Sequence, residues 1–110
     1  MACNIQSLQH FDNRFKRLAK KFKSLNEELF NLVEILTDNP THGISLGAGL
    51  YKIRLGSESK GGGKSGGFRV ITYYLEQTPD GKTLYLVTIY DKSEESSVKK
   101  DSLIKLVKSI

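Results

Sequence analysis

The stretch LYKIRLGSESKGGGKSGGFRVITYYL, residues 50–75, decides how this 110-residue chain is interpreted. Its two ends are rich in Ile, Val, Leu and Tyr, which favour strands, and a run with five glycines between Gly61 and Gly67 separates them. A third segment of the same kind, residues 84–90, follows a Pro-Asp-Gly turn signal. Three consecutive strands of this kind favour an antiparallel meander.

Two helices are expected before this stretch. Apolar residues recur at helical spacing between residues 11 and 22, with basic residues at the other positions, which predicts an amphipathic helix from Asp12. Ser24 followed by Glu27 is a capping-box pattern, in which the serine oxygen accepts a hydrogen bond from the backbone N–H of residue 27. A second helix should therefore begin there and end before Pro40, because the residue before a proline avoids the helical region.

The two ends of the chain complete the expected fold. Residues 4–8 alternate in polarity and are interpreted as an edge strand, and residues 99–109 carry the apolar pattern of a short third helix. We therefore predict a single α+β domain over residues 1–110. In it, an N-terminal strand and a helical hairpin pack on an antiparallel sheet of three to four strands, and a short helix follows at the C-terminus.

Charge is distributed unevenly along the chain. The net charge is +5, and residues 1–23 hold six Lys and Arg against one acidic residue. This basic end suggests a polyanion or an acidic protein as partner, whereas a solvated, lysine-rich helix face is the alternative. No apolar run approaches the roughly 20 residues that span a bilayer, and no leader pattern is present, so we expect a cytoplasmic protein without a membrane partner. With one cysteine and two histidines, we expect no metal and no cofactor.

Basic side chains lie on the strands of the opening stretch. Because side chains alternate across a strand, Lys52 and Arg54 share one face. The sequence leaves open whether Arg69 of the next strand lies on that face. If it does, three cations converge on one surface, where their repulsion is unfavourable unless an anion binds. The alternative is an ordinary solvent-exposed sheet face, which commonly carries Lys and Arg.

Two further groups of residues are candidates for function. The third strand ends in Tyr90, Asp91 and Lys92, whose phenol, carboxylate and ammonium groups are competent in acid-base or electrostatic roles. The glycine run lacks the GxxxxGKS/T spacing of a phosphate-binding P-loop. We interpret it as a basic hairpin loop in which Lys60 and Lys64 follow a phosphate backbone, and a plain flexible connection is the alternative.

The segments YKIRL, SGGFRVITYY and LYLVTIYDKSE, in this order after two helices, resemble the RelE/HigB toxins of bacterial type II toxin-antitoxin modules, within the RelE/ParE superfamily. The resemblance covers nearly the whole chain. It implies a messenger RNA endoribonuclease that acts mainly in the ribosomal A site, where a 2′-hydroxyl attacks the adjacent phosphate without a metal. It also implies a cognate antitoxin, often a helix-turn-helix repressor encoded beside the toxin.

The resemblance also assigns roles to residues. Lys52, Arg54 and Arg69 match basic positions of the family, and it implies that they grip the scissile phosphate and stabilise the transition state. Lys92 matches a position that often holds a further basic or acid-base residue, and Tyr90 and Asp91 stand where some members carry an acid, tyrosine and histidine cluster. The tyrosine that RelE carries near its C-terminal helix has no counterpart here. Asp91, Tyr90 and an unassisted mechanism therefore all remain open for the general base.

The basic first helix is a candidate for contacts with RNA. We assign Arg17, Lys20 and Lys21 to RNA binding together with Lys60 and Lys64, and the same helix is suited to an acidic antitoxin segment. Two other functions remain open. A ParE-like inhibitor of DNA gyrase would share the fold without needing the strand cations, and a non-catalytic member would keep only the surface that binds the antitoxin.

Overall fold

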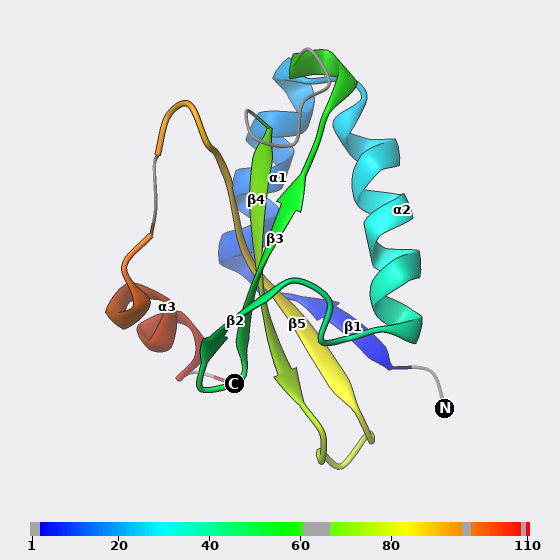
Figure 1. Cartoon of the computed structure of the whole chain (residues 1–110), viewed down its shortest axis with the longest axis vertical. Helices are drawn as coiled ribbons and strands as arrows, with labels where there is room; N and C mark the ends of the chain where they lie inside the picture. The colour runs from blue at the N-terminus through cyan, green and yellow to red at the C-terminus, as the bar shows by residue number, and fades with distance from the viewer. Residues whose placement is uncertain (1–2, 61–66, 96–97, 109) are drawn as a thin grey trace.

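The computed structural model describes residues 3–60, 67–95, 98–108 and 110. Within them the chain forms three α-helices, a short 3-10 helix and one five-stranded sheet (Figure 1). In chain order the elements are β1 (Asn4–Ser7), α1 (Gln9–Lys21), α2 (Leu25–Asp38), β2 (Ile44–Gly47), β3 (Leu50–Leu55), η1 (Glu58–Lys60), β4 (Phe68–Leu75), β5 (Thr83–Asp91) and α3 (Lys100–Val107). The described helices are all too short or too polar to cross a bilayer.

The sheet confirms the α+β fold class and is larger than expected. Its strand order is β1-β5-β4-β3-β2, and the predicted meander of β3, β4 and β5 is antiparallel. β1 pairs in parallel with β5, and β2 adds a fifth strand beside β3. β2 has only four residues, most of them exposed, and it leads into a turn in which Gly47, Ala48 and Gly49 all have positive φ angles. Its sequence ISLG alternates, but four residues ending at a glycine are too few to identify a strand from the sequence alone.

The two predicted helices, α1 and α2, pack on one face of the sheet. α1 begins at Gln9, three residues before the predicted start at Asp12. α2 ends at Asp38, before Pro40, as expected. The core on this face consists mainly of apolar residues from both helices and from the inward positions of the strands, namely Cys3, Phe11, Leu18, Leu25, Leu32, Leu36, Ile53, Phe68, Val70, Leu84, Leu86 and Ile89. The chain thus buries one complete helical hairpin against the sheet.

The expected capping box at α2 is wrong. Within the described residues the Ser24 side chain makes no capping bond, and its backbone is already helical, with φ −75° and ψ −9°. Its Oγ instead lies 2.6 Å from Ser59 Oγ and accepts a hydrogen bond from the Ser59 N–H at 3.1 Å. The serine therefore joins the start of α2 to η1, a tertiary contact that a local sequence pattern does not reveal.

The predicted third helix, α3, is confirmed and packs on the opposite face of the sheet. Its buried Leu103 contacts a second core cluster formed by Leu50, Ile71, Val87 and Tyr90. Because Leu50 begins β3, α3 covers the beginning of that strand's outer face. Arg54, near the other end of β3, remains exposed.

Candidate active site

The strand register brings three of the predicted site residues into one row. Arg54 of β3 pairs with Arg69 of β4, and Arg69 pairs with Tyr90 of β5. Residues directly opposite each other on neighbouring strands point to the same face, with Cβ atoms about 5 Å apart. Lys52 lies on this face as well, because it is two residues from Arg54. The register thus places Arg69 on the face of Lys52 and Arg54. This answers the question of its orientation, which the sequence left open.

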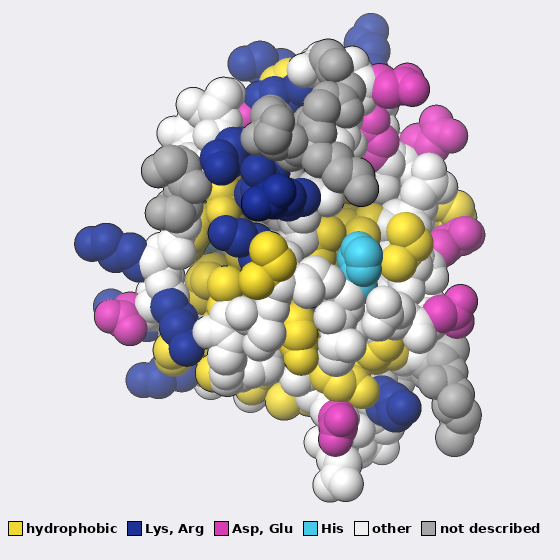
Figure 2. All heavy atoms as spheres, viewed as in Figure 1, with side chains coloured by type: hydrophobic (Ala, Val, Ile, Leu, Met, Phe, Trp, Pro, Cys, Tyr) yellow, Lys and Arg dark blue, Asp and Glu magenta, His cyan; other side chains and the backbone are white. Residues whose placement is uncertain are grey.

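This cross-strand row, Arg54–Arg69–Tyr90, contains both buried and exposed groups. Arg54 is exposed and Lys52 is half-buried, whereas Arg69 and Tyr90 are only 3% and 2% exposed. Arg69 Nη1 donates to the carbonyl of Phe68 at 3.1 Å, which helps to fix the guanidinium. Figure 2 shows Lys and Arg side chains gathered on this side of the molecule, over β3 and β4 as they lie in Figure 1. The row therefore combines a fixed, buried cation with one exposed cation, and the half-buried Lys52 lies beside it.

Tyr90 is protonated in this environment. Burial raises the pKa of its phenol above the ordinary value, and the neighbouring Arg69 only partly opposes this effect. A protonated phenol donates a hydrogen bond, and the adjacent guanidinium carries a fixed positive charge. Together these groups can neutralise an oxyanion and supply a proton to it, which is the chemistry needed at a phosphate that undergoes substitution.

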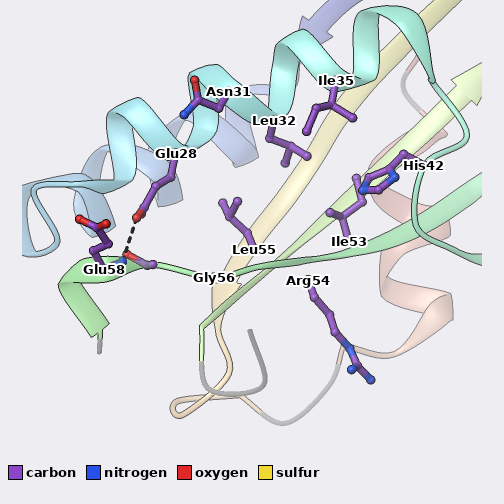
Figure 3. Close-up of a pocket in the computed structure, with 11 residues that line it drawn as sticks. Glu28, Asn31, Leu32, Ile35, His42, Ile53, Arg54, Leu55, Gly56 and Glu58 are labelled. Atoms are coloured by element: carbon purple, nitrogen blue, oxygen red, sulfur yellow. Dashed lines mark hydrogen bonds between the residues drawn. The ribbon is translucent and has the colours of Figure 1, made fainter. Parts of the chain in front are cut away.

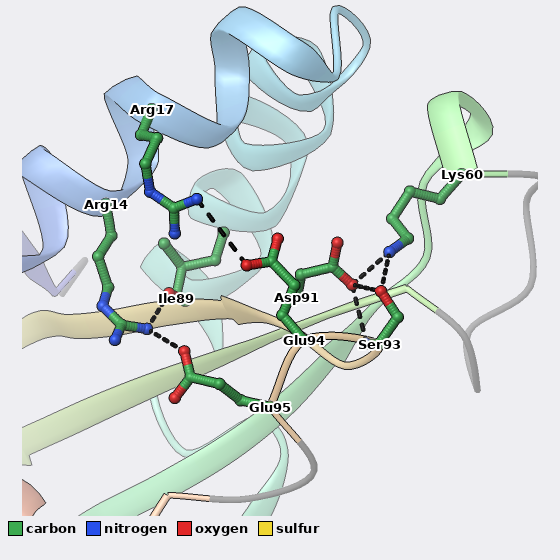
Figure 4. A network of polar contacts seen from close by, with 8 residues as sticks. All are labelled: Arg14, Arg17, Lys60, Ile89, Asp91, Ser93, Glu94 and Glu95. Atoms are coloured by element: carbon green, nitrogen blue, oxygen red, sulfur yellow. Dashed lines mark hydrogen bonds and ion pairs between the residues drawn. The ribbon is translucent and has the colours of Figure 1, made fainter.

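Asp91 and Lys60 lie on the other face of the sheet, the face that α1 and α2 cover. Lys60 Nζ forms an ion pair with Asp91 Oδ1, and the two side chains are 12% and 3% exposed (Figure 4). The same ammonium lies 5.3 Å from the centroid of the Phe22 ring and 5.4 Å from that of Phe68. This Lys60–Asp91 clip thus ties η1 to the end of β5 and separates both residues from the row that contains Tyr90.

The Asp91 carboxylate is held in its charged form. Burial acts to raise its pKa, but hydrogen bonds from Lys60 and Ser93 together outweigh burial and hold the pKa below the ordinary value. Asp91 Oδ1 accepts from the Ser93 N–H at 2.9 Å and from the Ser93 hydroxyl at 2.8 Å. Lys92, next in the chain, is exposed, and its backbone N–H donates to Gly67 at 3.1 Å.

The basic residues of α1 lie on exposed positions. Arg17, Lys20 and Lys21 are exposed, and Arg17 lies 4.0 Å from the carboxylate of Glu94. Lys64, predicted to bind RNA, lies outside the described residues. These cations do not belong to the cross-strand row. The predicted residues therefore form three groups, namely the row with Lys52 beside it, the Lys60–Asp91 clip and the basic side chains of α1.

Sequence reasoning missed the contacts that Arg14 and Ser93 make. Arg14 of α1 donates to Glu95 at 2.8 Å and to the Ile89 carbonyl at 3.3 Å, which anchors the helix to the end of β5. Ser93 completes the clip around Asp91. The Asp-Lys-Ser tripeptide is a signal that could have identified this turn, since an Asp side chain often bonds the backbone two residues ahead. Among the described residues, no cluster of His, Cys, Asp and Glu is arranged to hold a metal ion.

Comparisons with known proteins identify the fold and the family. The structure is similar to that of the E. coli toxin RelE, solved as a double arginine-to-alanine mutant in the free state, with a TM-score of 0.59 and 18% sequence identity. The match covers 100% of this chain and 99% of that one, so the two share a fold. Residues 10–109 match the family model described as the RelE toxin of the RelE/RelB toxin-antitoxin system. The chain therefore belongs to the RelE toxin family.

Proposed function

We propose that this toxin is a ribosome-dependent messenger RNA endoribonuclease whose active site is the cross-strand row with Lys52 beside it. The observation that carries the proposal is the direct register of Arg54, Arg69 and Tyr90 across three neighbouring strands. Neighbouring cations on one sheet face repel one another, and a bound phosphate would relieve the repulsion. A neutral phenol beside these cations supports phosphate chemistry rather than anion binding alone.

In the proposed reaction, the ribose 2′-oxygen of the message attacks the adjacent phosphorus. A bond forms between the 2′-oxygen and phosphorus, the bond from phosphorus to the 5′-oxygen breaks, and the products carry a 2′,3′-cyclic phosphate and a 5′-hydroxyl. Lys52, Arg54 and Arg69 stabilise the extra negative charge of the transition state. Tyr90 donates its phenolic proton to the leaving 5′-oxygen, while the proton of the 2′-hydroxyl passes to solvent or to RNA.

Asp91 is poorly suited to act as the general base. Its carboxylate lies on the face of the helices and is engaged by Lys60 and Ser93. We therefore assign Asp91 and Lys60 to holding the end of β5, and Lys92 to a contact with RNA beside the site. Of the three possibilities that the sequence left open for the general base, this proposal adopts the unassisted one, and Tyr90 acts as the general acid.

The partners follow from the same proposal. Arg17, Lys20 and Lys21 are exposed on α1 and are suited to the phosphate backbone of ribosomal RNA or of the message, and we keep Lys64 as a further predicted contact. The toxin would act in the cytoplasm and be held inactive by a cognate antitoxin, which we expect to be of the helix-turn-helix type.

The test is growth arrest after induced expression without the antitoxin, combined with primer extension on a translated message. Arg54→Ala is the informative variant because Arg54 is exposed, so its replacement leaves the core intact. Lys82→Ala is the matched control, since it removes an exposed cation from the turn before β5. Cleavage that is lost in Arg54→Ala and retained in Lys82→Ala would support the proposal. Arrest without message cleavage, unchanged in both variants, would instead point to a gyrase-type target, and a folded wild type that causes no arrest would point to a non-catalytic role.

A further inference from the structure

The strand β5 changes face part-way along its length. Leu84 and Leu86 pack in the core under α1 and α2, so strict alternation would send Tyr90, another even-numbered position, to the same face. Tyr90 instead packs in the second core cluster, on the α3 side of the sheet. This is also the face to which Arg54 points, away from α2 (Figure 3). Without the change of face, the cross-strand row would lack its phenol.

A bulge at Val87 produces this change of face. Leu86 and Thr88 pair with consecutive residues of β4, so Val87 between them is an extra residue in β5. Val87 packs in the second core cluster, as does Ile71, the β4 partner of Thr88. An extra residue interrupts the ladder and re-aims the side chains that follow it. The alternation therefore restarts at Thr88, which points to the same face as Tyr90.

The segment that follows the bulge has a strand on one side only in the described part of the chain. β4 pairs with Thr88 and Tyr90 on the inner side. On the outer side, β1 pairs with β5 only as far as Leu86, and the N–H of Leu8 donates to the Leu86 carbonyl at 3.0 Å. Because a bulge also increases the local twist, this segment needs a further restraint to hold a side chain in one position.

The helix α1 supplies such a restraint from the outer edge. His10 Nε2 lies 3.0 Å from the hydroxyl oxygen of Thr88, which is only 2% exposed. One helical turn later, Arg14 Nη1 donates to the Ile89 carbonyl at 3.3 Å (Figure 4). Residues four positions apart lie on one face of a helix, so His10 and Arg14 act together. They contact the two residues of β5 that immediately precede Tyr90, where a longer β1 would have paired.

Glu95 completes this brace by fixing Arg14. The nitrogen of Arg14 that contacts Ile89 also donates to Glu95 Oε1 at 2.8 Å. The N–H of Glu95 donates to the Asp91 carbonyl at 3.0 Å, which turns the chain back beside β5. Burial lowers the pKa of His10, and the Arg14 charge lowers it further against the opposing effect of Glu95. The imidazole is therefore mainly neutral at pH 7 and adds no second cation beside the guanidinium.

We propose that His10 and Arg14 are positioning residues that hold the bulged end of β5, so that the Tyr90 phenol faces the phosphate bound by the arginines of the row. This inference rests on the proposed function, in which Tyr90 gives a proton to the leaving 5′-oxygen. Proton transfer requires hydrogen-bond reach, and a misplacement of about 1 Å can lower a rate about 100-fold. Loss of the brace should therefore slow the chemical step without weakening the binding of the programmed ribosome.

The test measures single-turnover cleavage of a message on programmed ribosomes, at varied concentrations of purified full-length toxin. Arg14→Gln, His10→Ala and Thr88→Val should each lower the rate at saturation at least about tenfold, while the toxin concentration for half-saturation changes less than about threefold. Adding His10→Ala to Thr88→Val should lower the rate less than about twofold further, because the two residues share one bond. Lys16→Gln is the matched control. It removes one charge from an exposed position of α1 and should leave both quantities within about twofold.

A spectroscopic measurement reports the phenol without ribosomes. In toxin that contains fluorotyrosine, the fluorine resonance of residue 90 is assigned by its loss in Tyr90→Phe. It should broaden or split in Arg14→Gln and stay as in the wild type in Lys16→Gln, because the phenol becomes mobile only without the brace.

Two results would overturn the positioning role while leaving the proposed nuclease intact. One is an undiminished rate at saturation in both Arg14→Gln and Thr88→Val, and the other is an unchanged resonance of residue 90 in Arg14→Gln. Thr88→Val keeps the shape of the side chain, so it carries the test if circular dichroism shows that Arg14→Gln is unfolded. A folded wild type that cleaves no message would overturn the proposed function and this inference with it.

Discussion

Replacing Lys60 by methionine should destabilise the protein by about 3 kcal/mol. Lys60 and Asp91 form an ion pair with exposures of only 12% and 3%. Removing one partner of a buried pair leaves an uncompensated charge in a poorly solvated site, which costs about 3–5 kcal/mol. We take the lower value because Ser93 still donates two hydrogen bonds to Asp91. Methionine keeps an apolar stem beside Phe22 and Phe68, so the effect reports mainly the lost charge.

The assay is urea unfolding at pH 7 in a double-mutant cycle with Asp91→Asn. When residue 91 is uncharged, Lys60→Met should cost less than about 1 kcal/mol, because no buried charge is then left without a partner. In thermal unfolding, the single Lys60→Met variant should melt roughly 12 °C below the wild type, at about 4 °C per kcal/mol. A loss below about 0.5 kcal/mol in the wild-type background, or an equal loss in both backgrounds, would refute the reasoning.

The clip also predicts how stability depends on pH. The pKa of Asp91 is lower in the folded protein than its ordinary value, so the unfolded state binds the proton more readily. The contribution of the ionised Asp91 carboxylate to stability is therefore fully present above its unfolded-state pKa of about 3.9. This contribution is lost as the pH falls below that value and through the folded-state pKa. Between pH 5 and pH 2, the free energy of unfolding should fall less steeply in Asp91→Asn than in the wild type. Parallel curves would contradict this assignment.

Three further substitutions test other parts of the molecule. Tyr90→Phe should lower the rate of message cleavage at least about 100-fold while changing the free energy of unfolding by less than about 1 kcal/mol, and undiminished cleavage would remove Tyr90 from the mechanism. Gly43→Ala should destabilise the fold by about 2 kcal/mol, because φ is 112° and the added Cβ would meet the Lys52 oxygen at 2.6 Å; a neutral result in urea unfolding would count against the local geometry. Leu103→Ala should cost about 3 kcal/mol by leaving a cavity between α3 and Tyr90, and unchanged stability would show that α3 is loosely attached.

Strong periodicity explains which parts of the fold could be predicted. β3, β4 and β5 are long apolar strands, and α1 and α2 carry continuous helical stripes, so their positions follow from local sequence. The pairing partners do not, because the parallel contact of β1 with β5 joins residues about 80 positions apart. The same limit applies to the site. The alternation rule grouped Lys52 with Arg54, but only the register of β3 with β4 aligned Arg69 with them.

The end of β5 illustrates a different limit. Tyr90 and Asp91 are neighbours in sequence and were grouped as candidates, yet adjacent residues of a strand point to opposite faces. The Asp91 side chain therefore lies with Lys60 on the face that α1 and α2 cover. The Tyr90 side chain lies with Arg54 and Arg69 on the other face. The partner of Asp91 lies 31 positions away, in η1, and no pattern in the sequence indicates that contact.

The position of β5 between β1 and β4 has a consequence for how a newly made toxin matures. Residues 83–91 are synthesised after the other strands of the sheet, and β1, although made before those strands, has no neighbour to pair with until they emerge. The cross-strand row of Arg54, Arg69 and Tyr90 is also incomplete until Tyr90 has been synthesised. Strand pairing between residues so far apart in sequence is slow. We therefore expect nascent chains stalled before residue 83 to remain protease-sensitive and unable to cleave RNA, as pulse proteolysis of stalled complexes would measure. Under the proposed function, a ribosome that synthesises this chain would be spared until β5 has emerged.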